Sequence, residues 1–467
     1  MVEFLFYSLI ALLFWFFSLN TLYLIILILS IFEINKTKKN RYMYDINQVF
    51  RYKLLPPISI ILPAYNEEKT IVESVYSLLF LHYPLYELIV VNDGSKDDTL
   101  KILKKSFDLL KTDYVFRRAI PTEPVIDIYV SRTFKNLIVV DKKNGGKADA
   151  LNVGINISRF PYFCAIDADT ILGEDALSKL IRPFIHAPEK TIAVGGVIKA
   201  ANNAEIQRGR LIKEGLPRNI LVLLQTVEYA RAFFMGRMGL STLNSLLIIS
   251  GAFGLFRKED VLEAGGYKRG SLGEDMMLVV KLHKIKKEKK EKYRVSFVPD
   301  TVSWTEIPST FKVLRRQRIR WQVGLLESLF ENRKMFFNPR YGRIGLFAFP
   351  FYFFSEVVSP FFEIFGYGIL AYGILINQFF LPHIISFIVL TYGYGLLHSA
   401  IGLVLEYYAL GKGIPVKNLL IRTLSTLIEP FFYRQINIAY KLAGIFKFFS
   451  KKREWGAMER IGFKKET

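Results

Sequence analysis

The stretch Phe163-Cys164-Ala165-Ile166-Asp167-Ala168-Asp169 is a short apolar run that stops at two carboxylates separated by one residue. An apolar run of this length, bounded by a polar turn, is typical of a buried strand. A strand that ends in Asp-Ala-Asp brings two negative charges to one edge of a sheet, where we expect them to attract a cation. The pattern is weak by itself, because an acidic surface turn explains an isolated instance more simply.

Strand-like and helical patterns alternate on both sides of this stretch. Branched apolar runs at 58–62 and 87–91 flank a helical repeat from Ile71 to Leu79, which predicts a βαβ unit. Further strands are expected at 137–140, 162–166 and 192–197, and further helices at 147–157 and 175–185. The sequence therefore predicts an α/β fold with a doubly wound, mostly parallel, Rossmann-like sheet.

Carboxylate-bearing turns follow three of the predicted strands, at 63–68, 92–95 and 167–169. Ligands of open α/β sheets bind at the carboxyl ends of the strands. Repulsion between the carboxylates also needs a cation or hydrogen bonds to offset it. We therefore favour a shared ligand site over three unrelated helix caps.

The segment Asn144-Gly145-Gly146-Lys147 opens the predicted helix ahead of the acidic strand. Glycine amides at a helix amino end, together with the charge of Lys147, suit a phosphate. The spacing is not that of a P-loop, and an ordinary turn is the alternative.

The composition indicates that part of the chain lies in lipid. Of 467 residues, 51% are hydrophobic and 15% aromatic, and the mean hydropathy is +0.24. The net charge of +21 is concentrated beside apolar segments, which favours anionic lipid as a partner over nucleic acid. The single cysteine, Cys164, excludes an intramolecular disulfide, and its apolar surroundings predict a buried, inert thiol.

Apolar segments near both ends of the chain predict membrane helices. Residues 4–32 are long enough to span, and the positive cluster that follows places the amino terminus outside and the next residues in the cytosol. Residues 344–376 predict one kinked span or an interfacial helix followed by a span, whereas 381–405 predict a clearer span. Residues 416–449 predict a helix in the interface or against protein.

These segments define the expected domains. They are an amino-terminal transmembrane helix (1–34), a cytosolic domain (35–343), carboxyl-terminal transmembrane and interfacial helices (344–449) and a basic cytosolic tail (450–467). Acidic groups and a histidine at membrane depth indicate a polar path, helix ends or buried pairing; these are Glu356, Glu363, His398 and Glu406.

Two further clusters of polar residues precede the second apolar region. Glu274-Asp275 opens a predicted helix, where an acidic pair is favourable without any function. A helix that we expect to start at Pro308 carries Gln317, Arg320 and Trp321 at positions that project together, with other arginines around them. Such a face suits a multiply charged anion or a sugar ring.

In this order, Asp93, Asp167-Ala168-Asp169, Gly273-Glu274-Asp275 and Gln317-Arg318-Ile319-Arg320-Trp321 form a set that resembles the inverting family-two membrane glycosyltransferases. That family includes the synthases of cellulose, chitin, hyaluronan and poly-N-acetylglucosamine. The resemblance implies an A-type glycosyltransferase fold inserted between transmembrane helices. Gly273 departs from the threonine usual in the cellulose branch, which weakens an assignment to cellulose.

The resemblance also implies roles for residues of this chain. Asp275 would be the catalytic base, and Asp169 with Asp167 would bind Mg²⁺ or Mn²⁺. The nucleotide-binding residues would be Ala64, Tyr65, Glu67, Asp93, Lys147 and Asp167. The diphosphate and the acceptor would be held by Gln317, Arg318, Arg320 and Trp321.

The implied reaction is transfer of a sugar from a UDP-sugar to a hydroxyl of a growing β-linked polysaccharide, by single displacement with inversion. The expected partners are the donor, a glycan or lipid-linked acceptor and membrane lipid, and the resemblance allows an accessory export subunit. One alternative is a non-processive transferase that adds one sugar to a lipid. Another is an inactive membrane scaffold or export subunit.

Overall fold

The computed structural model describes residues 2–43, 55–207, 210–376, 381–411 and 415–450. The chain forms two compact units, which are described separately. The sheet unit comprises the described residues between 37 and 217 and between 246 and 307. The helical unit comprises those between 2 and 36, between 218 and 245, and between 308 and 450. The predicted basic tail, from 451 onward, falls outside the described residues.

The sheet unit is built on a ten-stranded mixed sheet. In spatial order its strands are β3 (Leu109–Lys111), β4 (Val125–Ser131), β5 (Leu137–Lys142), β2 (Tyr86–Asn92), β1 (Ile58–Ala64), β6 (Tyr162–Ile166), β11 (Phe253–Arg257), β8 (Thr191–Ala200), β12 (Arg294–Thr305) and β7 (Thr170–Leu172). Strands β5, β2, β1 and β6 are mutually parallel, and β8 is parallel to β12. The other pairs, including those of β11 with β6 and β8, are antiparallel.

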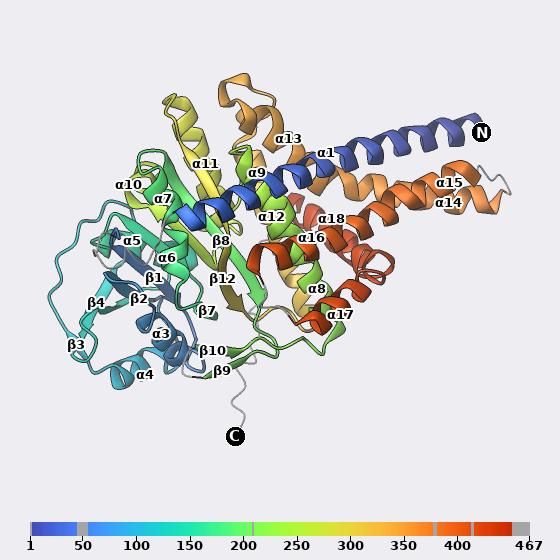
Figure 1. Cartoon of the computed structure of the whole chain (residues 1–467). Helices are drawn as coiled ribbons and strands as arrows, with labels where there is room; N and C mark the ends of the chain where they lie inside the picture. The colour runs from blue at the N-terminus through green and yellow to red at the C-terminus, as the bar shows by residue number, and fades with distance from the viewer. Residues whose placement is uncertain (1, 44–54, 208–209, 377–380, 412–414, 451–467) are drawn as a thin grey trace. The chain divides into compact units, whose positions relative to one another are not determined.

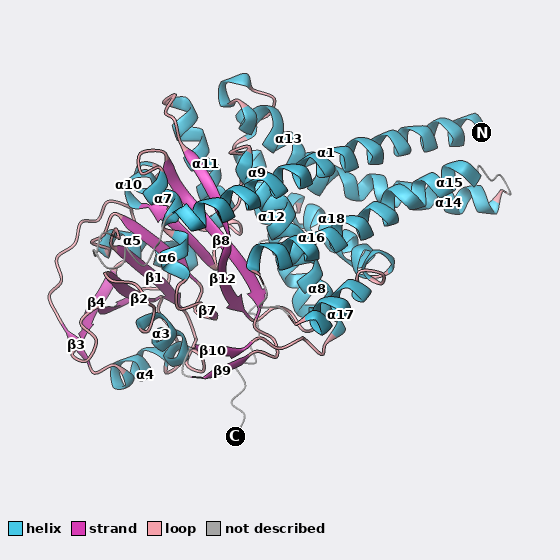
Figure 2. Ribbon diagram, in the orientation of Figure 1, coloured by secondary structure: helices cyan, strands magenta, loops and turns pink. Residues whose placement is uncertain are grey.

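Alternation along β1 distributes helices over both faces of the sheet. Ile60 and Leu62 belong to one apolar cluster with α3 (Ile71–Leu79), α4 (Thr99–Ser106), α6 (Ala176–Leu180) and α7 (Arg182–His186). Ile61 points the other way and contacts Gly154 of α5 (Lys147–Ile157) so closely that a side chain there would overlap it. Figure 2 shows the strands as one layer flanked by helices. The remaining helices of this unit are α10 (Lys258–Glu263) and α11 (Glu274–Glu288).

The predicted α/β fold is confirmed, with local corrections. Strand β6 and helix α5 have the predicted bounds. The single helix expected at 175–185 is instead two short helices, because Pro183 cannot donate the hydrogen bond that would continue the first one. The helical stretch expected beyond Ala200 is preceded by an unforeseen hairpin of β9 (Glu205–Gln207) and β10 (Arg210–Lys213).

The described part of the chain contains three helices that are long and apolar enough to cross a membrane, judged by length and composition alone. They are Leu5–Lys39, Ile344–Leu375 and Leu381–Leu410. The first lies in α1 (Val2–Met43). The second is continuous through α14 (Ser359–Leu375) and contains π-helical turns near its prolines, so one irregular helix replaces the alternative of two. The third runs from α15 (Leu381–Ile388) to α16 (Tyr394–Leu410). Apolar side chains of helices α1, α14 and α15 form one cluster, and Figure 1 shows these helices running along one another.

The other helices of this unit are α8 (Ile220–Ala230), a π-helical segment at Arg231–Arg237, α9 (Met238–Thr242), α12 (Phe311–Glu331), α17 (Val416–Ser425) and α18 (Tyr433–Phe449). Helix α12 starts at Phe311 rather than at Pro308, because the side chain of Thr310 caps it by accepting from the amide of Val313. The region expected at 416–449 is split into α17 and α18 around Pro430, and α18 packs against α12.

Three of the glutamates that the sequence predicted at membrane depth are paired within the helical unit. Glu363 pairs with Arg434 at 2.8 Å, and Glu406 with Arg422 at 2.7 Å. Glu356 pairs with Lys441 at 2.7 Å. Of the explanations that the sequence left open, the structure supports buried pairing for Glu363 and Glu406, whereas the pair of Glu356 and Lys441 is one third exposed.

Candidate active site

The Asp-Ala-Asp turn leaves the sheet where β6 ends. Ala168 is buried, and its carbonyl accepts a hydrogen bond from the hydroxyl of Ser74 on α3. The amide of Thr170 donates to the carbonyl of Asp167 at 3.0 Å, which closes the turn. Asp167 and Asp169, on either side of the buried alanine, are both partly exposed. The local fold therefore presents two carboxylates at the sheet edge and anchors the residue between them.

Lys147, at the first position of α5, lies against the acidic turn. Its ammonium forms an ion pair with Asp167 and lies 3.6 Å from a carboxylate oxygen of Glu274. Burial works against the charged form, but the neighbouring carboxylates of Asp167, Glu274 and Asp275 outweigh it and raise the pKa of Lys147. The side chain therefore remains a cation at neutral pH, shared by acids from two different elements.

Asp275 lies in the first turn of α11, beside the same lysine. Its Oδ2 atom accepts a hydrogen bond from the amide of Gly251 at 3.1 Å. A Cβ atom at Gly251 would lie 3.0 Å from the Lys147 ammonium and 3.7 Å from Oδ2 of Asp275. The absence of a side chain at this one position therefore lets the backbone approach both charged groups.

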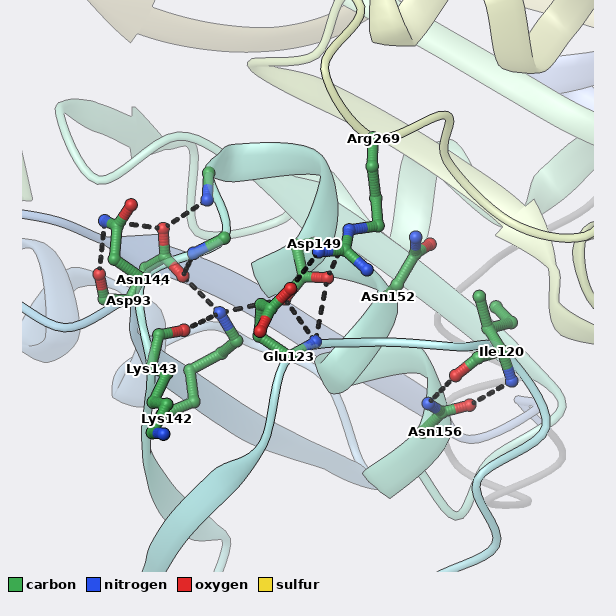
Figure 3. Close-up of polar contacts among 12 residues, drawn as sticks. Asp93, Ile120, Glu123, Lys142, Lys143, Asn144, Asp149, Asn152, Asn156 and Arg269 are labelled. Atoms are coloured by element: carbon green, nitrogen blue, oxygen red, sulfur yellow. Dashed lines mark hydrogen bonds and ion pairs between the residues drawn. The ribbon is translucent and has the colours of Figure 1, made fainter.

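Asp93, which follows β2, is buried beneath the glycine turn that precedes Lys147. Its carboxylate accepts from the amides of Gly145 at 3.0 Å and Gly146 at 2.7 Å (Figure 3). It also forms an ion pair with the buried ammonium of Lys142. The sequence suggested that the glycine amides bind a phosphate. This prediction is corrected, because both amides already donate to the Asp93 carboxylate. The predicted contact of Asp93 with uridine stays a prediction.

The loops after β1 and β2 are joined by hydrogen bonds. The amide of Asn66 donates to the hydroxyl of Ser95 at 3.0 Å, and the amide of Glu67 donates to the hydroxyl of Thr99 at 2.9 Å. Within this edge Ala64 and the Glu67 side chain are buried, and Glu67 accepts from Thr70. Tyr65 is exposed. The predicted contacts of these residues with a nucleotide stay predictions.

The predicted diphosphate and acceptor residues lie on α12, which belongs to the helical unit. Arg318 is buried and makes two hydrogen bonds of 2.7 Å to the carboxylate of Glu228. Trp321 is exposed. The guanidinium carbon of Arg318 lies over the Trp321 ring, 4.5 Å from the ring centre. Gln317 and Arg320 are half-buried. Arg318 therefore has an internal partner, whereas the predicted roles of Gln317, Arg320 and Trp321 stay predictions.

Several residues near the acidic edge were not singled out as site residues from the sequence. Glu274 adjoins the predicted base, and only the structure shows its approach to Lys147. Tyr267 is buried nearby; burial raises the pKa of its hydroxyl, and Asp275 and Glu274 add to the rise. Lys142 belongs to a charged dipeptide that resembles a surface turn, yet its side chain is 0% exposed. Cys164 is buried as predicted, and burial raises its pKa, which keeps the thiol protonated.

The carboxylates of the turn fit a divalent ion that is bound together with a diphosphate. The described part of the chain contains no group of three or more His, Cys, Asp or Glu side chains able to hold a metal. Mg²⁺ commonly takes one or two protein carboxylates and completes its shell with water and substrate phosphates. Asp167 and Asp169 supply two hard oxygen ligands of this kind.

A mixed α/β sheet with an acidic turn and a helix-borne carboxylate at one edge defines the A-type class of glycosyltransferases. The family model described as glycosyltransferase-like family 2 matches residues 56–324, more than half of the chain. The chain belongs to this family. The mannosyltransferase PcManGT from Pyrobaculum calidifontis, solved with GDP-Man and Mn²⁺, covers 95% of this chain and 100% of its own, with a TM-score of 0.52 and 16% identity. At this identity the likeness concerns the fold alone.

Curated relatives include two bacterial poly-beta-1,6-N-acetyl-D-glucosamine synthases. That of Staphylococcus aureus (strain COL) is 29% identical over 309 residues, which is 65% of this chain and 64% of the relative. That of Staphylococcus epidermidis (strain ATCC 35984) is 31% identical over 276 residues, which is 59% of this chain and 56% of the relative. The chain thus matches less than two thirds of the length of either relative.

Proposed function

We propose that this protein transfers a sugar from a UDP-sugar to a hydroxyl of a growing β-linked polysaccharide. The observation that carries the proposal is the convergence of Lys147, Asp167 and the Glu274-Asp275 helix start on one edge of the sheet. Similarity to the poly-N-acetylglucosamine synthases supports UDP-N-acetylglucosamine as the first donor to test.

Asp275 is the proposed general base. Its Oδ2 atom already accepts from the Gly251 amide, which fixes the direction of the carboxylate. Its Oδ1 atom accepts from the amide of Met276 at 2.8 Å. Each carboxylate oxygen has a further lone pair, and one of these takes the proton of the acceptor hydroxyl as the hydroxyl oxygen attacks the anomeric carbon. One base acting on an acceptor, without a covalent intermediate, gives inversion, so an α-linked donor yields a β-linkage.

Lys147 is the proposed electrostatic partner of the leaving diphosphate. Breaking the bond between sugar and phosphate places additional negative charge on the diphosphate. A lysine that its neighbours keep protonated stabilises that charge without proton transfer. A divalent ion held by Asp167 and Asp169 would neutralise part of the same charge when it is bound.

The proposed setting is a membrane, with the sheet unit in the cytosol. Three helices of sufficient length and apolarity support it, and lysines 36, 38 and 39 follow the first apolar segment. Chain elongation, export of the product and an accessory subunit belong to the same proposal and rest on the family resemblance.

The test is incubation of the purified full chain with a panel of UDP-sugars, with Mg²⁺ or Mn²⁺, while released UDP and product size are measured. We expect metal-dependent UDP release and a polymer with one of the donors. The Asp169→Ala variant should lose release, whereas Asp98→Ala, which removes an exposed acid outside the turn, should retain it. Release without a polymer would favour the non-processive alternative, and a folded wild-type chain without release would favour the inactive scaffold.

A further inference from the structure

Helix α5 is enclosed by protein, and this includes its polar side chains. All of its residues from Ala148 to Ile157 are buried. Three of them, Asp149, Asn152 and Asn156, are polar and recur at helical spacing, so they lie on one face of the helix. A polar group in the interior needs hydrogen-bond partners, since a group without them costs stability. The partners of these three residues therefore show what the helix holds in place.

Each of the three side chains binds the backbone of a distant segment. Figure 3 shows these contacts for Asp149 and Asn156. Asp149 accepts from the amide of Glu123 at 3.1 Å. Asn156 accepts from the amide of Ile120 at 2.9 Å and donates to the carbonyl of the same residue at 2.8 Å. These two side chains hold the segment between β3 and β4, and Asp149 also pairs with Arg269 at 3.0 Å.

Asn152 holds a different segment, the one that leads to the proposed base. Its Nδ2 atom donates to the carbonyl of Tyr267 at 2.8 Å, and its Oδ1 atom accepts from the amide of Tyr267 at 2.8 Å. The side chain of Asn152 thus hydrogen-bonds both the N–H and the carbonyl of the buried residue Tyr267. From Tyr267 the chain runs through a short loop to Gly273 and then enters α11, where Asp275 lies in the first turn.

Two consecutive glycines allow this close approach. Gly265 and Gly266 both have a left-handed backbone, with φ of +75° and +72°. A Cβ atom at Gly266 would lie 2.5 Å from Oδ1 of Asn152, whereas a Cβ atom at Gly265 would meet nothing within 4 Å. The loop is therefore shaped to bring its backbone onto Asn152.

From this geometry we infer that Asn152 is a positioning residue that sets the location of Asp275 relative to Lys147. One rigid helix carries Lys147 at its first position and Asn152 further along, and Asn152 fixes the segment that delivers Asp275. The distance between the cation and the base is therefore set through α5. This inference rests on the proposed function, in which Asp275 is the base.

The first experiment compares two asparagines that make the same kind of contact. In the purified full chain, Asn152→Asp and Asn156→Asp each replace a buried amide donor by a carboxylate facing a backbone carbonyl. We expect Asn152→Asp to lower kcat by about 10- to 100-fold, because small displacements of a reacting group have effects of this size. The KM for the donor and the affinity for UDP should change by less than about 3-fold, because the lost interaction affects the transition state rather than donor binding. Asn156→Asp should lower the Tm comparably and retain kcat within about 3-fold.

The second experiment approaches the same contact from the loop and remains available if Asn152→Asp does not fold. Gly266→Ala and Gly265→Ala impose the same left-handed backbone strain, but only the first places a methyl group against Asn152 and against the Ile120 side chain. The Tm of Gly266→Ala should therefore be the lower of the two. At a temperature where both variants are fully folded, we expect Gly266→Ala to lower kcat by about 10-fold more than Gly265→Ala does.

The outcomes separate this inference from the proposed function. Equal kcat losses within the asparagine pair or within the glycine pair, at matched folded fractions, would overturn the positioning role. The Asp275→Asn variant is measured in the same assay. If that variant kept full activity, the base assignment itself would fail; if it were inactive while Asn152→Asp and Gly266→Ala matched their controls, only the positioning role would fail.

Discussion

The paired acids of the helical unit contrast with the acidic edge of the sheet unit, where partly exposed acids share one cation. In the helical unit, acidic side chains pair individually with arginines: Glu228 with Arg318, Glu363 with Arg434, Glu406 with Arg422 and Glu429 with Arg231. In the sheet unit, Lys147 is shared by Asp167 and Glu274, with Asp275 beside it. An individual buried pair fixes two helices and is costly to break. A shared cation at an edge leaves carboxylates that a ligand, a metal or a proton can engage.

The largest effect that we expect is at Asp275. Asp275→Asn keeps the volume and one of the two oxygens that accept from the Gly251 and Met276 amides, but removes the proton acceptor. Transfer should therefore fall by about 10³-fold or more. UDP release measures the loss, and calorimetric titration with UDP should show unchanged affinity. Lost UDP binding in a folded variant would refute the role of this residue as base.

Next in size is the pair of Arg318 and Glu228. Arg318→Met leaves the partly buried Glu228 carboxylate without its guanidinium but with the hydrogen bond from the Tyr433 hydroxyl, which should cost about 3 kcal/mol of stability. Thermal unfolding in detergent measures the change, and the double variant with Glu228→Leu should recover most of it. If the single variant instead kept its stability and lost UDP affinity, Arg318 would bind the diphosphate as the family resemblance implied.

We expect the loss of Lys147 to affect activity more than stability, which is the converse of the expectation for Arg318. Lys147→Met removes the shared cation at the sheet edge, and we expect kcat/KM to fall by about 10²-fold, because a preorganised charge near the leaving group is lost. The Tm should change little, since Asp167 remains partly exposed to water. A large stability loss with normal kinetics would place Lys147 in the same structural class as the paired arginines.

The smallest effect concerns acid stability of the sheet unit. Burial lowers the pKa of His283 from 6.5 to about 4, and the ring lies 2.8 Å from the carbonyl oxygen of Leu246 and 2.8 Å from the hydroxyl of Tyr293. The unfolded chain gains a proton at this histidine below pH 6.5, whereas the folded chain does not until about pH 4. Stability that is fully present above pH 6.5 is therefore lost as the pH falls through this window.

We expect a loss of about 1 kcal/mol between pH 7.5 and pH 5.5 from this residue. Denaturant unfolding at the two pH values measures it. The His283→Gln variant should be less stable at neutral pH but should lose less stability on acidification. An identical pH dependence in both proteins would show that other groups cause the loss of stability at acidic pH.

Most of the α/β framework could be predicted because its signals are local. Strand β6 and helix α5 were located correctly from an apolar run and from helical spacing. The pairing of β9 with β10 was missed, since two short strands of this kind have neither signal. The break between α6 and α7 was visible as Pro183 but was given too little weight.

The candidate site could be predicted only in part. Its residues stood out because carboxylates follow strand ends, but the sequence did not show which cation each one meets. Asp93 appeared to be a ligand group, and the structure places it under a glycine turn with Lys142. Arg318 appeared to belong to an anion-binding face, and the structure gives it Glu228 instead.

The sequence by itself determined where the strands and membrane-length helices lie and which acids end at the sheet edge, because hydrophobic period and strand-end position are properties of adjacent residues. Only the tertiary structure decided which charges pair. Lys142 and Asp149 contact each other at 2.8 Å with neither side chain exposed, although the same letters in a sequence resemble a solvated turn. Ion pairing depends on groups brought within a few ångströms by the packing of distant segments, and the order of residues along the chain does not specify that distance.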